Sequence, residues 1–311
     1  MQNLAELIDP GVRPDTRLGP VQVARSSAPN LPLTVIIPVR NEAANLSRCL
    51  NALRGVGEVY VIDSQSHDAT AAIAASFGAQ MVQFHYAGGW PKKRQWALDS
   101  LPIAFDWVLL LDADEILTPQ LADEIRRAIL DSCIDGFYVT LQMHFLGREL
   151  RHSGASFSKL SLFRRGKGRF ECRLHEQDPS MCDMEVHEHV IVSGRVASLR
   201  APLLHRNVES LSHYIRKHDQ YSNWESHVLA APSVSSSELQ PRLLGSQAQR
   251  RRWIKKCFFK FPGSPAALFL YRYFARLGFL DGIPGLIYCL FQAIQMFHTK
   301  AKLYEQRMAG R

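Results

Sequence analysis

Residues Asp106–Glu115 read D-W-V-L-L-L-D-A-D-E, an apolar run that stops on carboxylates. The run Val108–Leu111 has the length and composition of a strand that is buried on both faces. Asp112 and Asp114 follow it directly, at the end of the strand where parallel sheets bind ligands. Carboxylates at that point can hold a divalent cation and, through it, the phosphates of a ligand. The alternative is a strand followed by a helix cap, because Thr118-Pro119 is typical of a helix start.

Apolar runs and helix-forming segments alternate on both sides of this strand. The expected strands are residues 33–38, 59–63, 80–84 and 108–111, and the expected helices are residues 41–50, 69–77 and 92–98. This alternation predicts an α/β fold with a mostly parallel sheet and helices on both faces. Asp63 and Asp112 are therefore expected at the same edge of the sheet. The runs 136–144, 159–163 and 190–192 are expected to add antiparallel strands that complete a pocket.

The composition is that of a globular protein with a substantial core. The chain has 311 residues, of which 46% are hydrophobic and 21% are charged. Its six cysteines include no CxxC pair, and Cys172, His175, Cys182 and His187 fit no standard zinc spacing. The N-terminus lacks the apolar core of a signal peptide. These features predict reduced thiols and a cytoplasmic location.

The positive charge is concentrated near the C-terminus. Residues 239–280 contain nine Lys and Arg residues and no acid, against a net charge of +8 for the whole chain. We expect a tail at residues 1–30, one domain at 31–229, a linker at 230–249 and a basic amphipathic helical region at 250–311. Basic residues interleaved with Phe, Tyr, Trp and Leu favour an element that lies on an anionic membrane.

Two other interpretations of this C-terminal region are open. Residues 282–297 are uncharged, but this run is shorter than the 20 or so apolar residues of a spanning helix. A packed helical hairpin with a solvated basic edge would also explain the pattern. Nucleic acid is not an expected partner, because no groove-reading or base-stacking motif accompanies the charge.

Three motifs fall at the ends of expected strands. They are P-V-R-N-E at residues 38–42, D-S-Q-S-H-D-A-T at 63–70 and D-A-D at 112–114. Together they resemble the family 2 inverting glycosyltransferases of the GT-A fold, over roughly residues 31–225. V-H-E-H at residues 186–189 and G-G-W-P-K-K-R-Q-W-A-L at 88–98 are similar to the branch that adds β-1,4-linked glucose to the lipopolysaccharide core.

The resemblance implies a set of residues that bind a nucleotide-sugar donor. They are Pro38, Asn41 and Glu42 in the first turn, Asp63, Ser66 and Asp68 after the second strand, Lys92, Lys93 and Arg94 near the diphosphate, and Asp112 by the ribose. A diphosphate requires basic partners of this kind. The simpler interpretations are that Asn41 and Asp68 cap helices and that the three basic residues form a solvated face.

The resemblance also implies a metal. Asp114 would bind Mg²⁺ or Mn²⁺ directly, with Asp112 beside it and His205 as one further ligand, although a histidine of the core is the alternative for His205. A divalent cation stabilises the negative charge that builds on the departing diphosphate. Few protein ligands are needed, because phosphate oxygens and water complete the coordination.

An inverting transfer needs a base that removes the proton of the acceptor hydroxyl. We expect Glu188 in this role, with Glu185 and Asp183 as alternatives. Processive members of the family carry Q-x-x-R-W, whereas Gln220–Trp224 has Asn in place of the Arg. Gln249–Trp253 fits that pattern literally but lies in the basic run. Transfer of one sugar is therefore expected.

The predicted function is transfer of glucose from UDP-glucose to a membrane-displayed glycolipid or saccharide, such as a lipopolysaccharide core, at the inner leaflet. Another nucleotide-sugar transferase of the cell envelope is the nearest alternative. A nucleotidyltransferase would need a Gly-rich loop after the first strand, where this chain has P-V-R-N-E. A non-catalytic membrane-bound carbohydrate-binding scaffold is the alternative from another class.

Overall fold

The computed structural model describes residues 30–173, 183, 185, 188–206, 210–230, 242–244 and 247–309. All but the last residue of the tail expected at residues 1–30, and most of the linker expected at 230–249, lie outside this part. Of the four Cys and His residues considered for zinc, only Cys172 is described. The expected domain boundaries therefore stay predictions.

Twelve strands and eight α-helices make up the described chain. The strands are β1 (Leu31–Val39), β2 (Val56–Asp63), β3 (Gln80–Gln83), β4 (Trp107–Leu110), β5 (Glu115–Ile116), β6 (Gly136–Phe145), β7 (Arg148–Glu149), β8 (Phe157–Arg164), β9 (Gly168–Phe170), β10 (Val190–Val192), β11 (Val196–Ser198) and β12 (Leu203–Arg206). The helices are α1 (Ala43–Ala52), α2 (Thr70–Ser76), α3 (Lys93–Ser100), α4 (Pro119–Ala128), α5 (Leu211–Ala230), α6 (Gln247–Lys260), α7 (Ser264–Leu270) and α8 (Gly282–Ala309).

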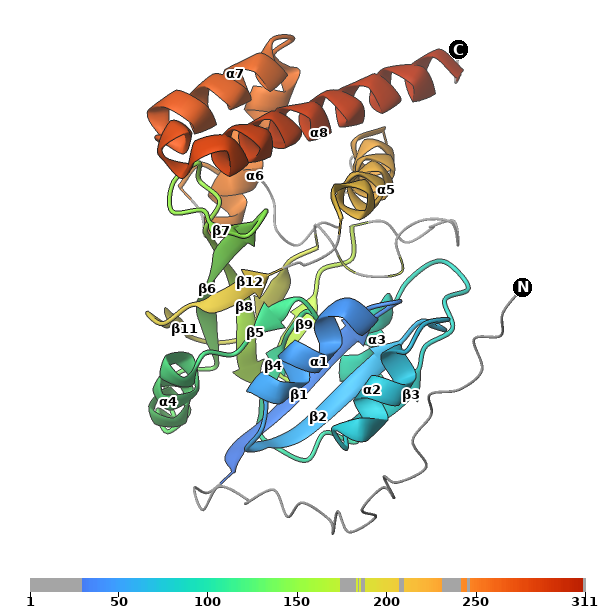
Figure 1. The fold of residues 1–311 in the computed structure, drawn as a ribbon, viewed down its shortest axis with the longest axis vertical. Coiled ribbons are helices and arrows are strands. Elements are labelled where there is room, and N and C mark those ends of the chain that lie inside the picture. Colours follow the sequence, from blue (N-terminus) through green and yellow to red (C-terminus); the bar gives the residue numbers. More distant parts are fainter. Residues whose placement is uncertain are drawn as a thin grey trace, which may run out of the picture.

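The N-terminal half confirms the predicted α/β class. Strands β3, β2, β1 and β4 are neighbours in this order, and all three pairings are parallel. Alternate residues of β1 point to opposite faces: Val35 and Ile37 pack with α1, α2 and α4, whereas Ile36 packs with α3. Helices thus cover both faces of the sheet (Figure 1). Strands β2 and β4 end on the same edge, which brings Asp63 and Asp112 there as expected.

The second half of the sheet is mixed rather than purely antiparallel as expected. Strand β8 is antiparallel to both β4 and β6, but β12 and β11 pair with β6 in parallel. Parallel pairing is possible because long connections return the chain to the same end of the sheet. Strand β10 does not join this sheet; it pairs with β9 in a separate ribbon. The parallel placement of β12 is what carries His205 to the D-A-D turn.

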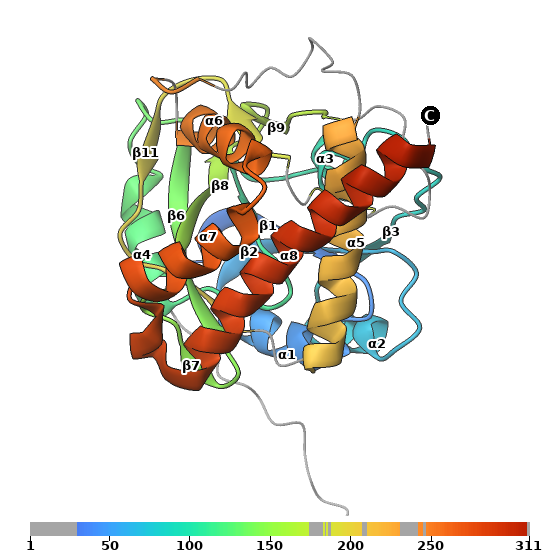
Figure 2. The same cartoon turned by 90° about the horizontal axis from the view of Figure 1, so that it is seen from above.

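The C-terminal helices form a layer at one end of the molecule, beyond β7 (Figure 1). Seen from above, α8 runs across α5, and the two helices are in contact (Figure 2). The uncharged run expected at residues 282–297 forms the first part of α8. Pro284 and Gly285 are tolerated because they lie in its first turn.

A buried carboxylate fastens this layer to the rest of the fold. Asp281 accepts hydrogen bonds from the backbone N–H groups of Arg151 and His152 and from the Ser153 hydroxyl. A short 3₁₀ helix, Gly278–Asp281, places the carboxylate directly before α8. The C-terminal region is therefore packed against the rest of the fold rather than held apart from it.

Candidate active site

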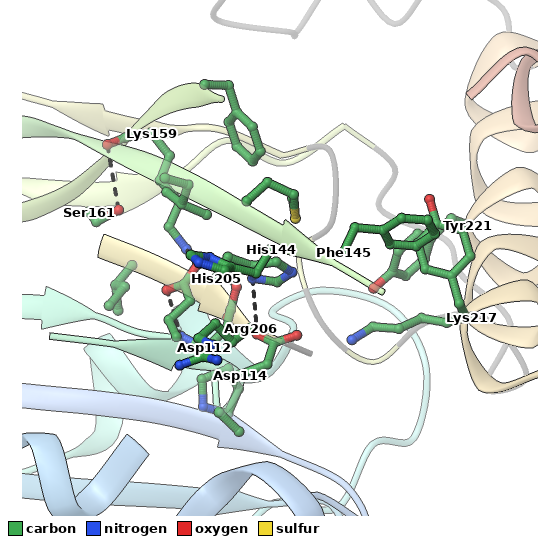
Figure 3. Close-up of a pocket in the computed structure, with 18 of the residues that line it drawn as sticks. Asp112, Asp114, His144, Phe145, Lys159, Ser161, His205, Arg206, Lys217 and Tyr221 are labelled. Atoms are coloured by element: carbon green, nitrogen blue, oxygen red, sulfur yellow. Dashed lines mark hydrogen bonds and ion pairs between the residues drawn. The ribbon is translucent and has the colours of Figure 1, made fainter. Parts of the chain in front are cut away.

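A cavity of about 760 Å³ begins at the D-A-D turn and extends to α5 and α8. At the sheet end it is lined by Pro38, Glu42 and residues of the D-A-D turn, and at the far end by Tyr214, Tyr288 and Gln292. Figure 3 shows the charged residues of the turn facing side chains of β6, β8, β12 and α5. The parallel half of the sheet therefore supplies one wall, and the second half with the C-terminal helices supplies the other.

Asp112 is held by two basic side chains. Arg94 of α3 forms an ion pair with one carboxylate oxygen, and Lys159 of β8 lies 3.3 Å from the other. Lys159 also pairs with Glu115 at 2.6 Å, and Glu115 accepts a hydrogen bond from the backbone N–H of Asp112. Burial would raise the pKa of Asp112, but Arg94 and Lys159 lower it well below its usual range. Asp112 is therefore ionised and its orientation is fixed.

Asp114 faces His205 across the same turn. The Asp114 Oδ1 atom lies 3.3 Å from the His205 Nδ1 atom, and both side chains are mostly buried. Burial opposes charge on both groups, but each stabilises the other, so the pKa of Asp114 is lowered and that of His205 is raised. The strand pairing explains the contact, because His205 of β12 is the partner of Glu115 in β5.

These two side chains fit the site of a divalent cation whose other ligands are supplied by the substrate and by water. The described residues contain no cluster of three or more His, Cys, Asp or Glu side chains that could hold a metal by themselves. The buried Nδ1 atom of His205 makes no hydrogen bond of good geometry to a described residue, although it lies at ion-pair distance from Asp114. The Asp114 carboxylate and the His205 imidazole, in its neutral form, match the small protein contribution that Mg²⁺ requires at phosphate sites. Asp112, by contrast, is occupied by its two basic partners.

The predicted nucleotide turn is a connected hydrogen-bonded unit. The backbone N–H of Asn41 donates to Ser66, and the N–H and hydroxyl of Ser66 both donate to Asp63. Asp68 accepts from the backbone N–H groups of Thr70 and Ala43, so it joins the starts of α1 and α2. Asn41 adopts a left-handed backbone with φ of 56° and makes no cap for α1; Glu42 occupies that position. The structure brings Asn41, Asp63, Ser66 and Asp68 together beside Pro38 and Glu42.

The three basic residues at the start of α3 are buried and paired, which excludes the interpretation of a solvated face. Lys92 pairs with Glu188 at 3.1 Å, and Lys93 pairs with Asp183 at 3.0 Å. Arg94, whose pair with Asp112 is described above, also donates to the carbonyl of Glu185. Of the three, only Arg94 lines the cavity. The triplet therefore fixes the segment that carries the candidate bases.

Glu188 lies outside the lining of the cavity. Its side chain is fully buried against Lys92, whose ammonium also sits 4.7 Å from the centre of the Trp224 ring. Glu185 does line the cavity, and burial raises the pKa of its carboxyl group. The Glu185 oxygens accept from the backbone N–H groups of Arg94 and Gln95 at the start of α3. Glu185, rather than Glu188, therefore lies at the cavity wall where a base is expected. Glu188 is buried instead in its ion pair with Lys92.

Several cavity residues were not predicted from the sequence. Lys159 lies in a strand otherwise rich in Phe, Leu and Ser, and an isolated lysine in such a strand could have indicated a buried ion pair. Tyr214, Lys217 and Tyr221 recur on one face of α5 at helical spacing, and all three line the cavity. That face could have been found from its period, but not its position opposite the D-A-D turn.

The class of protein follows from this fold, this site and a family match. Residues 34–184 match the model of the family described as "Glycosyl transferase family 2". The predicted resemblance to family 2 glycosyltransferases is therefore confirmed over residues 34–184. The match ends before β10, so the strand of His205 and all of the C-terminal helices lie beyond it.

Two of the following similar proteins extend over more of the chain. The lipopolysaccharide core biosynthesis glycosyltransferase LpsC of Rhizobium meliloti (strain 1021) is 28% identical over 292 residues, which cover 89% of this chain and 94% of LpsC. A mannosyltransferase from Pyrobaculum calidifontis, solved with GDP-Man and Mn²⁺, is 16% identical with a TM-score of 0.46, and the alignment covers 89% of both chains. Glucosyl-3-phosphoglycerate synthase from Mycobacterium tuberculosis, solved with Mn²⁺ and UDP, is 23% identical with a TM-score of 0.28; the alignment covers 37% of this chain and 44% of that chain.

Proposed function

We propose that this protein is a metal-dependent inverting glycosyltransferase that moves a single glucose from UDP-glucose to a lipopolysaccharide-core saccharide or a similar glycolipid. The observation that carries the proposal is the D-A-D turn, which opens into a large cavity with Asp114 beside His205. The likeness to LpsC over nearly its whole length supports the lipopolysaccharide core as the acceptor. The choice of UDP as the nucleotide and of glucose as the sugar rests on the resemblance of the sequence motifs.

In the donor half, the residues present fit the task of holding a nucleoside diphosphate. Asp114 and His205 would hold Mg²⁺ or Mn²⁺, which when bound would stabilise negative charge on the diphosphate. Asp112, held by Arg94 and Lys159, would lie beside the ribose. The unit of Asn41, Asp63, Ser66 and Asp68 would hold the base and the nearby sugar. Preorganised groups of this kind need little rearrangement during the reaction.

In the acceptor half, a carboxylate must take the proton of the attacking hydroxyl. Glu188 is the base that the motif implies, and to reach the cavity it must leave its ion pair with Lys92. Glu185 is the alternative that already lines the cavity, with a raised pKa suited to proton transfer. Substitution of each acid by Gln separates them: the true base loses transfer by about 100-fold or more, as expected for loss of general base catalysis.

The C-terminal layer would hold the protein at the inner face of the cytoplasmic membrane. Large apolar side chains are exposed along the segment from the end of α7 to the start of α8: Leu270, Tyr271, Phe274, Leu277, Phe279, Leu280 and Ile283. Arg276 and Lys260 are exposed in the same layer. Apolar and basic side chains together suit an anionic bilayer.

The packing of this layer favours contact with the membrane surface over a helix that spans the membrane. The segment Gly278–Met308 has the length and hydropathy of a membrane-spanning helix, as the core helix of a soluble protein can also have. One face of it is buried in the protein, however, at Tyr288, Cys289, Ala293, Thr299 and Leu303. A helix with these contacts suits a position on the membrane, with its exposed face toward the lipid.

A flotation assay tests the membrane proposal. Wild-type protein should bind vesicles of phosphatidylcholine with phosphatidylglycerol more strongly than vesicles of phosphatidylcholine alone, and high salt should weaken the binding. Ile283→Asp should reduce binding, whereas Leu130→Asp, a substitution at an equally exposed apolar residue near α4, should not. Equal binding of both variants would exclude this surface.

Donor binding tests the enzymatic proposal. UDP-glucose with Mn²⁺ should raise the melting temperature of wild-type protein, because a ligand that binds only the folded state stabilises it. Asp114→Ala should abolish both this shift and sugar transfer. The absence of any shift with UDP-, GDP- or dTDP-sugars in folded wild-type protein would contradict a donor site and favour a non-catalytic scaffold.

A further inference from the structure

One face of α5 reaches the cavity from the side opposite the sheet. Tyr214, Lys217, His218 and Tyr221 all line the cavity, as residues three and four positions apart on a helix share a face. Figure 3 shows Lys217 extending from α5 toward Asp114. The family match ends at residue 184, so it assigns no role to this helix. A lysine that faces the proposed metal ligands from another element calls for a physical explanation.

Lys217 differs from Arg94 and Lys159, two other basic residues of the cavity. Arg94 and Lys159 are each committed to a carboxylate at ion-pair distance, namely Asp112 for both and Glu115 for Lys159. Lys217 forms no ion pair with any acid in the described part of the chain. It is half-buried, and the surrounding Tyr221, Asp114, Glu42 and Asp112 raise its pKa, so its ammonium remains charged. A charged group that is directed into a cavity and has no ion-pair partner among the described residues is suited to bind an anion.

The proposed reaction creates an anion at this place. The bond between the anomeric carbon and the diphosphate oxygen breaks, and its electron pair stays on that oxygen. The acceptor oxygen bonds to the anomeric carbon, and its proton goes to the base. The nucleoside diphosphate thus gains one negative charge as it leaves. A cation placed where this charge develops favours the transition state over the bound donor.

We propose that Lys217 is a catalytic residue that binds the terminal phosphate of the departing nucleoside diphosphate, on the side opposite Asp114 and His205. This inference rests on the proposed function of the same site. It assigns to α5 a part in the donor chemistry, although this helix follows the whole sheet in sequence. A point charge on a flexible stem can follow the phosphate as the bond to the sugar lengthens.

Steady-state kinetics of four proteins test this role. Lys217→Met should lower kcat by about 100-fold, as removal of one group that stabilises a developing anion does, with little change in the KM for the donor. Lys217→Arg should recover part of the loss. Arg216→Met removes a neighbouring exposed charge of α5 and should behave as wild type. Equal melting temperatures of all four would show that the fold is intact.

Binding of UDP with Mn²⁺, measured by calorimetry without acceptor, separates the possible results. Lys217→Met should weaken the binding of UDP about tenfold, which corresponds to the loss of one charge-assisted contact. If wild type turns over the donor and the variant keeps wild-type kcat and UDP affinity, the inference is wrong and the proposed function stands. A rise in acceptor KM alone would place Lys217 in the acceptor site and also overturn it. Failure of wild type to bind UDP would instead contradict the proposed function.

Discussion

Asp281 offers a quantitative test of how the C-terminal layer is fastened. Asp281 as a whole is only 2% exposed, and its carboxylate accepts from Arg151 N at 3.1 Å, His152 N at 3.1 Å and Ser153 Oγ at 2.7 Å. The ring of His152 lies within 3.0 Å as well. A hydrogen bond to a charged group contributes about 1.5–3 kcal/mol, and donors left buried without a partner add a desolvation cost.

We expect Asp281→Ala to lower the free energy of unfolding by about 3–5 kcal/mol, which is less than the sum over the contacts because water can enter the space left behind. Urea denaturation followed by tryptophan fluorescence would measure the change. Limited proteolysis should also cut the variant faster between α7 and α8, since the layer is then less firmly held.

Asp106→Ala is a matched control, because Asp106 is exposed and its ion pair with Arg165 spans 3.6 Å at the surface. Its loss should cost no more than about 1 kcal/mol. A destabilisation of Asp281→Ala that is no larger than that of the control would refute the conclusion that this buried carboxylate fastens the C-terminal layer.

Two further predictions concern single positions. In Gly285→Ala the new Cβ would lie 2.4 Å from the carbonyl oxygen of Gly278, so the backbone must shift and urea denaturation should show a loss of about 1–3 kcal/mol; unchanged stability would mean that α8 can move at no cost. For Asp68, burial opposes ionisation, but the Thr70 hydroxyl and the backbone N–H of Ala43 lower its pKa. Its ionised form therefore stabilises the fold above the unfolded pKa of about 3.9, and this contribution is lost as the pH falls through the lower folded value. The melting temperatures of wild type and Asp68→Asn should thus differ at pH 7 and converge in acid; a constant difference would contradict this.

The first half of the fold was predictable because its signals are local. The strands and helices up to β4 fall within a few residues of the expected ranges, since apolar runs and helix formers alternate clearly there. The cap of α4 was also visible in the sequence: Thr118 accepts from the backbone N–H of Leu121, and Pro119 is the first residue of the helix.

The rest of the site depends on pairings that no local pattern reveals. Lys92 and Glu188 are separated by 95 residues in sequence but are in contact, and this pair places Glu188 in the core instead of the cavity. The parallel pairing of β12 with β6 and the position of Lys217 opposite Asp114 likewise depend on long connections. Sequence motifs therefore located the residues at the D-A-D edge of the cavity, whereas the far wall of the cavity required the three-dimensional structure.

The two walls of the cavity have a consequence for how relatives should be compared. A fragment that ended at residue 184, where the family match stops, would keep both acids of the D-A-D turn but lose His205, Lys217 and Tyr288. Under the proposed function, such a fragment would keep part of the donor site but lose one metal ligand, the phosphate-binding lysine and the far wall of the cavity. Two enzymes could therefore have nearly identical matched domains and still make different products. We expect that exchange of the segment from β12 onward between them would change which product is made.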